Sequence, residues 1–133
     1  MIVEQRENNT KCLYQYDLPI GKIEVYDDFV YTEFDEGVHI NATNAEKIYN
    51  VILEHFGSKS SFGYISNRIN SYSISPVELL RFRNLVDAEV KVALVTTTYK
   101  GKEAARYETL FWPKHFTVRH FENMTQAINW IST

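Results

Sequence analysis

The residues that most often bind metals or act as nucleophiles are few in this chain and lie far apart. Its histidines are His39, His55, His115 and His120, and none stands at the spacing by which two histidines of one helix hold zinc. Cys12 is the only cysteine, so a thiolate cluster is excluded. We expect the histidines to be surface or partly buried imidazoles and Cys12 to be a small core residue. The sequence therefore predicts no metal site.

Two pairs of adjacent acids, Asp27–Asp28 and Asp35–Glu36, carry the side chains that acid–base catalysis uses. Adjacent acids that flank strands are far more often turn and edge residues. The glycine patterns of phosphate loops and dinucleotide folds are absent, as is the Gly-x-Ser-x-Gly of many hydrolases. We therefore predict no catalytic residues, no cofactor and no enzyme activity.

One polar segment, Asn67–Ser75, is dense in side chains that donate and accept hydrogen bonds. It follows a predicted parallel strand, and open α/β sheets bind ligands beyond the carboxyl ends of such strands. Thr97–Tyr99 follows the next parallel strand and is expected to face the same crevice. Arg68 would offer a planar donor fork to a carboxylate or phosphate, near a helix start at Ser75–Pro76 whose free amides favour anions.

These two segments supply the candidate binding surface of the chain. Its residues are Asn67, Arg68, Asn70, Ser71, Tyr72, Ser73, Thr97, Thr98 and Tyr99. The alternative is that they merely cap and turn the backbone, because Asn, Ser and Pro are the residues that any such loop uses.

The elements that would position this surface begin with an antiparallel meander. Strands are predicted over Cys12–Leu18, Lys22–Tyr26 and Phe29–Phe34, since each is rich in β-forming residues and short turns join them. Val38–Ile40 is expected to add a short extension. A capping box of Thr43 with Glu46 then predicts the start of a helix whose apolar face runs to Phe56, before Gly57.

Strands and helices alternate in the remainder of the chain. Strands are predicted over Phe62–Ser66, Val90–Thr97 and Phe116–Phe121, and Val90–Thr97 is the most apolar. Helices are predicted from a Ser75 cap followed by Pro76, over Gly101–Phe111 before Pro113, and from an Asn123 cap to the C-terminal end. This order predicts a single-domain α/β fold over residues 11–133, a mixed sheet of about six strands with four helices. Residues 1–10 are predicted to form a flexible end.

Composition limits the classes of partner. The formal net charge is −3 and lysines and arginines are scattered, so no basic field for nucleic acid is expected. No apolar run is long enough to span a bilayer, no signal peptide is visible, and one cysteine fits a reducing compartment. The sequence therefore predicts a cytoplasmic protein without integral membrane association. A protein partner is expected, and a small apolar ligand and a homodimer are left open.

The order of elements and the C-terminal segment resemble the SpoIIAA-like (STAS-like) family, whose prototypes are bacterial anti-anti-sigma factors. The resemblance covers roughly residues 11–131 and is carried by the strand Val92–Val95, the helix with Ala104–Ala105, and the segment His115–Ile131. It implies a regulatory, protein-interaction module without catalysis. The fold is also compared with the lipid-binding Sec14 type, which implies a carrier of small apolar ligands or lipids as the alternative.

The same resemblance implies candidate phosphoacceptors. Prototypes carry an Asp-Ser-(Ser/Thr)-Gly turn with a phosphorylated serine, and Ser71, after Asn70, stands near its position. Ser73 is the second candidate. Because no glycine follows in this sequence, a binding site without phosphorylation is expected ahead of a phosphoswitch.

Overall fold

The computed structural model of the chain describes residues 11–112 and 114–133, and it is a mixed α/β fold. Within these residues it contains four helices and a main sheet of six strands, as the sequence predicted. The elements are β1 (Tyr14–Leu18), β2 (Gly21–Val25), β3 (Phe29–Phe34), β4 (His39–Ile40), α1 (Ala42–Phe56), β5 (Ser61–Asn67), β6 (Ser73–Ile74), α2 (Pro76–Leu85), β7 (Glu89–Val95), α3 (Tyr99–Thr109), β8 (Phe116–Phe121) and α4 (Met124–Ile131). The expectations for residues 1–10 and for Pro113 lie outside the described residues.

The main sheet has the strand order β1-β2-β3-β5-β7-β8. The first three strands pair antiparallel, and β3, β5, β7 and β8 pair parallel, so the predicted meander and the predicted parallel part are both confirmed. Gly21, which directly follows the first turn, has a φ of 143°, and a Cβ there would lie 2.4 Å from the carbonyl oxygen of Glu33. Only glycine tolerates both conditions, so the turn between β1 and β2 depends on it.

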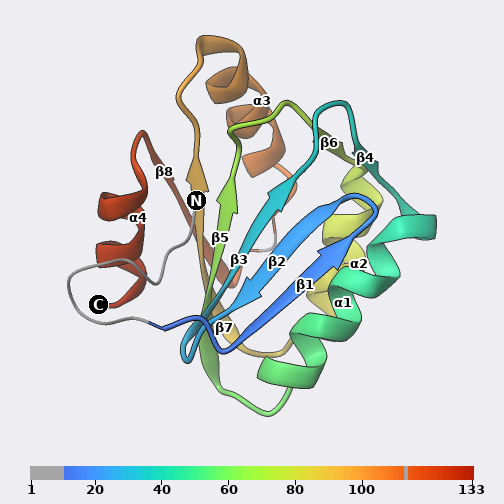
Figure 1. Cartoon of the computed structure of the whole chain (residues 1–133), viewed down its shortest axis with the longest axis vertical. Helices are drawn as coiled ribbons and strands as arrows, with labels where there is room; N and C mark the ends of the chain where they lie inside the picture. Colours follow the sequence, from blue (N-terminus) through green and yellow to red (C-terminus); the bar gives the residue numbers. More distant parts are fainter. Residues whose placement is uncertain (1–10, 113) are drawn as a thin grey trace.

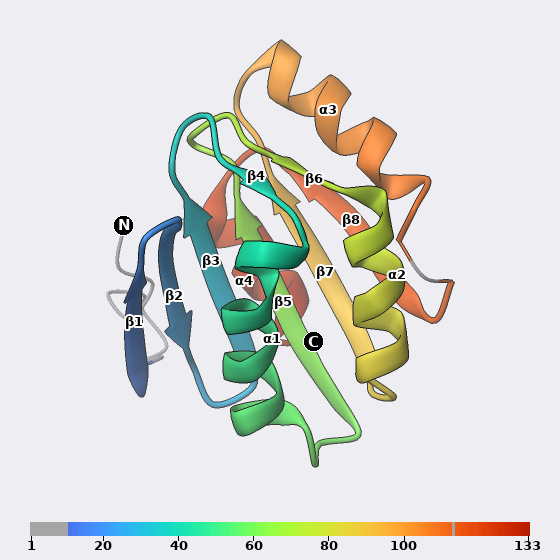
Figure 2. The ribbon, with the colours of Figure 1, turned by 90° about the vertical axis from the view of Figure 1, so that its right-hand side faces the viewer.

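Helices cover the two faces of the sheet unequally. Figures 1 and 2 show α1 and α2 side by side on one face and α4 on the other, while α3 projects at the end where β5 and β7 finish. Side chains of β7 alternate between these faces: Val92 and Leu94 join the cluster under α1 and α2, whereas Ala93 and Val95 join the one under α4. β7 lies between β5 and β8, which explains why the predicted core residues Val92, Leu94 and Val95 are buried.

The helix α4 packs closely on the sheet at Gly63 of β5. A Cβ at Gly63 would lie 2.5 Å from Cγ2 of Ile131, so the missing side chain is the space that this end of α4 occupies. Asn123 caps α4 by accepting a hydrogen bond from the backbone nitrogen of Gln126 at 2.9 Å. The capping residue predicted for this helix is therefore the one that caps it.

The start of α1 differs from the prediction. Asn41, not Thr43, is the N-cap, and a reciprocal capping box joins Asn41 and Asn44 instead of Thr43 and Glu46. The two-residue strand β4 pairs parallel with β6 in a separate small sheet, which keeps the chain extended up to Asn41. A side chain of Asn44 also donates to the carbonyl oxygen of His39 at 3.0 Å, so the helix begins directly after β4.

The start of α2 lies at the predicted residue, but its cap is incomplete. Ser75 is the N-cap and Pro76 follows it, yet the Ser75 side chain makes no capping hydrogen bond. Glu78, at the third helical position, instead accepts hydrogen bonds from the hydroxyl of Tyr49 at 2.8 Å and from Arg81 at 2.9 Å. Burial is the main cause that raises the pKa of Tyr49 above its ordinary value, and the hydrogen bond to Glu78 raises it further. This carboxylate joins α2 to α1.

Candidate functional site

The two predicted binding segments meet at one end of the sheet. Asn67 pairs with Val95 at the carboxyl ends of β5 and β7, and the backbone nitrogen of Arg68 donates to the carbonyl oxygen of Val95 at 2.9 Å. An open hollow of about 160 Å³ lies between the loop after β5 and the first turns of α3. The residues that line it are Glu36, Arg68, Ile69, Asn70, Ser71, Tyr72, Thr98, Lys100, Gly101 and Ala104. Five of the nine predicted residues are among them, and their role in binding stays a prediction.

Arg68, which lines the hollow and forms its floor, belongs to a buried ion pair. A guanidinium nitrogen of Arg68 lies 2.5 Å from a carboxylate oxygen of Glu108 on α3, and the two side chains are 7% and 8% exposed. The other oxygen of Glu108 accepts a hydrogen bond from the indole of Trp112 at 2.9 Å. Burial alone would lower the pKa of Arg68, but Tyr72 and Glu108 raise it above its ordinary value. Arg68 is thus a charged residue that is already paired.

Arg68 also contacts two further residues of the loop and its strand. Its Nε atom donates to the hydroxyl of Ser66 at 2.8 Å, and its guanidinium stacks over the ring of Tyr72 at 4.3 Å. The hydroxyls of Ser66 and Tyr72 are 2.5 Å apart, and burial raises the pKa of Tyr72. With its donors facing Glu108 and Ser66, Arg68 positions the loop and the helix instead of presenting a free fork to a ligand.

The rim of the hollow is held by contacts to the turn after β3. The side chain of Asn70 donates to the carbonyl oxygen of Phe34 at 3.0 Å, and the backbone nitrogen of Ser71 donates to a carboxylate oxygen of Glu36 at 3.0 Å. The backbone nitrogen of Gly37 in turn donates to the carbonyl oxygen of Ser71 at 2.7 Å. These bonds fix the backbone of the loop and leave the hydroxyl of Ser71 on the surface.

On the other side of the hollow, Thr98 and Tyr99 begin α3. The hydroxyl of Thr98 is the N-cap acceptor for the backbone nitrogen of Gly101 at 3.0 Å. Tyr99 is 80% exposed, and Thr97 is exposed as well. Lys100, which is exposed, also lines the hollow. The predicted turn residues therefore divide into one that caps the helix and two whose side chains reach solvent.

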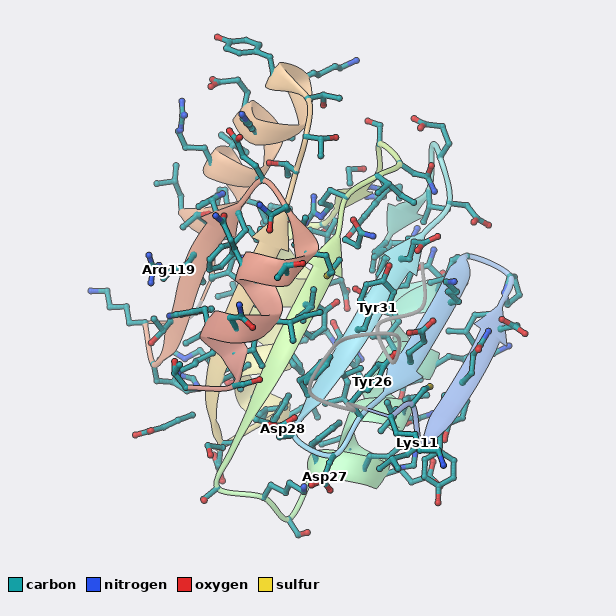
Figure 3. The ribbon with its side chains drawn as sticks, turned by 60° about the vertical axis from the view of Figure 1, so that its left-hand side comes forward. Lys11, Tyr26, Asp27, Asp28, Tyr31 and Arg119 are labelled. Atoms are coloured by element: carbon teal, nitrogen blue, oxygen red, sulfur yellow. The ribbon has the colours of Figure 1, made fainter. Side chains whose placement is uncertain are left out.

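Asn67 lies apart from the other candidates. It is 3% exposed and points to the opposite face of the sheet, where it donates to the hydroxyl of Tyr31 at 2.7 Å. Tyr31 in turn donates to Glu33 at 2.7 Å, and burial raises the pKa of its hydroxyl. Figure 3 shows Tyr26 and Tyr31 on this face, on which α4 also lies. Asn67 is the last residue of β5, so strand alternation turns it away from the hollow.

Ser73 forms a serine–histidine pair, which the sequence did not predict. Its hydroxyl lies 2.7 Å from Nδ1 of His39, because β4 and β6 pair these two residues side by side. Both side chains are exposed, and within residues 11–112 and 114–133 no carboxylate bonds the imidazole. A catalytic triad needs that third group to orient the base, so the pair is a surface contact between two short strands.

Of the remaining candidate groups, Glu36 of the second acid pair lines the hollow, whereas Asp27, Asp28 and Cys12 do not. In the described part of the chain, no group of three or more histidine, cysteine, aspartate or glutamate side chains could hold a metal ion. Figure 3 shows Asp27 and Asp28 in the turn before β3, at the end of the sheet opposite to α3. Cys12 is partly buried and packs against the cluster under α4. The acid pair at 27–28 is therefore a turn pair, as its position in the sequence indicated.

An apolar pocket also lies between α1, α2 and the sheet, with a volume of about 30 Å³. Its walls are mainly apolar, with two hydroxyls and one carboxylate. The lining residues are Ile40, Ala45, Ile48, Tyr49, Ile52, Tyr64, Ile74, Glu78, Phe82 and Trp112. A volume of this size is about that of one water molecule.

Sequence reasoning treated Glu36 as a turn or edge residue and missed two other charged residues of this region: Lys100, which lines the hollow, and Glu108, which pairs with Arg68. For Glu108 a signal was present: it follows Ala105 by three residues and precedes Trp112 by four, so it shares the inward face of the helix. A carboxylate on an inward face needs a buried partner, and Arg68 is that partner.

Comparisons with known proteins add no relative to this description. No family model, no curated protein and no solved structure matches the chain. No helix in the described ranges is both long and apolar enough to cross a membrane.

Proposed function

We propose that this chain is a non-catalytic interaction module of the SpoIIAA-like (STAS-like) type, which binds a protein partner at the hollow between the loop after β5 and α3. The observation that carries the proposal is the contrast between the floor and the rim of this hollow. The floor is a closed network around Arg68 and its partner Glu108, whereas Ile69 on the rim is 56% exposed. An exposed apolar side chain on a rigid support is typical of a binding surface.

The chemistry of the floor supports a binding role over a catalytic one. Catalysis would need a nucleophile or base with an unpaired atom that a substrate can reach. Here Arg68 is bonded to Glu108 and Ser66, and the hydroxyl of Ser66 is bonded to Tyr72. Because each group is occupied by another, the network is suited to hold the loop in one conformation for a partner.

The proposal favours binding without phosphorylation of the loop. A phosphate on Ser71 would stand beside the carboxylate of Glu36, which accepts the backbone hydrogen bond of the same residue. The strand β6 separates Ser71 from Pro76, where α2 begins, so the amides of that helix start do not offset the repulsion. Ser73 already contacts His39 and lies on the small sheet instead of on the hollow.

The alternative of a lipid or apolar-ligand carrier has less support. Pockets that hold small molecules have volumes of roughly 300–1,000 Å³. The apolar pocket under α1 and α2 has about 30 Å³, and aromatic and aliphatic side chains fill the remainder of that space. A carrier would have to open this core. Native mass spectrometry of the purified protein tests this directly, because a co-purified lipid or apolar acid would support the carrier and contradict our proposal.

The test of the proposed surface is a pull-down from native lysate with matched variants. Arg68 and Tyr72 are unsuitable for substitution because both are buried and support the fold. We would instead compare the parent with an Ile69→Asp, Lys100→Glu double variant. The control is Val77→Asp on α2, whose side chain is 60% exposed.

We expect the double variant to lose a partner that the parent and the control both retain. All three proteins should keep the same thermal midpoint, because the substituted side chains are exposed. Recovery of the same partners by all three proteins would remove the hollow from consideration.

A further inference from the structure

The helix α3 carries large apolar side chains on its outward side and a buried carboxylate on its inward side. Its inward side carries Ala105, which is fully buried, and the carboxylate of Glu108. The three most exposed large hydrophobic side chains of the described residues all lie on this helix: Tyr99 at 80%, Leu110 at 76% and Tyr107 at 64%. The spacing of Tyr99, Tyr107 and Leu110 brings them to one face, and Leu110, the C-cap, still has helical backbone angles. A helix normally buries such a face.

Nothing in the described chain covers this outward face. Figures 1 and 2 show α3 as the outermost element at its end of the molecule, projecting past the strands instead of lying across them. Two opposite charges, Glu103 and Arg106, lie on the same face between Tyr99 and Leu110 and form an ion pair of 2.6 Å along the helix. The face is therefore apolar at both ends and carries one acid and one base at its centre.

We propose that this face binds the α3 of a second copy of the chain, with the two helices antiparallel about a two-fold axis. Such an interface pairs the same patch on both subunits. The register that sets Tyr99 against Leu110 of the partner also sets Glu103 against Arg106 of the partner, and the converse pairs form by symmetry. Apolar contacts at both ends and opposite charges at the centre are satisfied at once, which makes the face complementary to itself.

The size of the face sets the strength of this dimer. Stable interfaces bury about 1,200–2,000 Å² in total, and a pair of helices of three turns buries less than this. The dimer therefore belongs to the weak class, with a dissociation constant on the order of 10–100 μM. Its contacts are distinct from the loop at Ile69, so the two proposals are tested by different substitutions.

The first experiment measures association of the purified chain by sedimentation equilibrium from about 5 μM to about 1 mM. We expect a monomer–dimer equilibrium in the parent, and at least about tenfold weaker association in a Leu110→Ser variant. The matched control is Leu80→Ser on α2, which removes another exposed leucine, 49% exposed, and should leave association unchanged. A parent that stays monomeric over the whole concentration range overturns the proposal. This holds even if α3 of that monomer binds a different protein. Equal weakening by the control overturns the proposal as well.

The second experiment tests the register through charge. In a Glu103→Arg variant, and equally in an Arg106→Glu variant, the two facing positions carry like charges and each protein alone should associate at least about tenfold more weakly. A mixture of the two variants should form a heterodimer of near-parent affinity, because every facing pair is then opposite in sign. Loss of the intrahelical ion pair is the same alone and in the mixture, so recovery reports the facing contact. No gain on mixing would contradict the proposed pairing.

Discussion

Replacing Glu108 by alanine removes one member of the buried ion pair under the hollow and leaves the other in place. Arg68 would keep its guanidinium in a position where the side chain is 7% exposed, without the carboxylate that now lies 2.5 Å away. The indole of Trp112 would also lose its acceptor. The remaining contacts of Arg68, to Ser66 and to the ring of Tyr72, carry no negative charge.

The expected loss follows from the burial of both members. Removing one partner of a buried pair costs about 3–5 kcal/mol, because an uncompensated charge remains in the interior. The higher helix propensity of alanine offsets only a few tenths of a kcal/mol. A double variant, Arg68→Met with Glu108→Leu, removes both charges at similar volume and should recover about half of the loss or more. The recovery is incomplete because Trp112 and Ser66 each lose a hydrogen bond.

Urea denaturation of the parent, the Glu108→Ala variant and the double variant measures these free energies of unfolding, provided that the slopes agree. An exposed ion pair gives the matched control: Glu103→Ala, which breaks the surface contact with Arg106, should cost less than about 1 kcal/mol. A loss below about 1 kcal/mol for Glu108→Ala would contradict this prediction, since the guanidinium of Arg68 would then have reached water. A double variant as unstable as the single one would contradict it as well.

Three further predictions concern the fold. Leu94→Ala should cost about 2–5 kcal/mol in the free energy of unfolding, because β7 lies between two strands and this side chain is fully buried; a loss below about 0.5 kcal/mol in urea denaturation would contradict that position. Asn41→Ala should lower the free energy of unfolding by about 1 kcal/mol and Ser75→Ala by much less, because of these two N-cap residues Asn41 alone makes a side-chain capping bond. Equal denaturation midpoints for the two variants would contradict the assigned caps. Partial burial, and to a smaller extent the charge of Arg106, lowers the pKa of the His120 imidazole below 6.5. The unfolded chain therefore binds a proton at His120 more readily than the folded chain does, and stability falls as the pH drops below that value. A His120→Asn variant should flatten this fall, and an imidazole pKa above 6.5 by NMR titration would contradict the prediction.

The alternating fold could be predicted from this sequence because its signals are local. The strands of the meander are rich in β-forming residues between short turns, and Asn123 is followed at once by an apolar helical pattern. The start of α1 was mispredicted because Thr43 with Glu46 and Asn41 with Asn44 have the same spacing. The choice between them depends on β4, which pairs with a distant strand and is too short to show a period of its own.

The candidate site was harder to predict than the fold. That Thr98 would approach the loop after β5 follows from parallel strands, whose carboxyl ends share one edge. Whether Arg68 faces solvent depends on Glu108, which is distant in sequence and lies on a helix whose orientation the sequence does not fix. Asn67 was predicted to begin the loop, because its strand was predicted to end one residue earlier, at Ser66; in the structure it is the last residue of β5 and bonds to Tyr31.

The division of the sheet into an antiparallel and a parallel part has a consequence for the order in which the chain folds. β1, β2 and β3 can pair through the turns at Pro19–Ile20 and at 26–28, so little chain entropy is lost in bringing them together. Each later strand of the main sheet is joined to the preceding one by a crossover that contains a helix, and such non-local pairing is slow. The meander is thus available early as a template, and β3 offers its open edge to β5. The pairing of β5 with β3 is therefore the first slow step of folding, after the rapid local pairing of β1, β2 and β3.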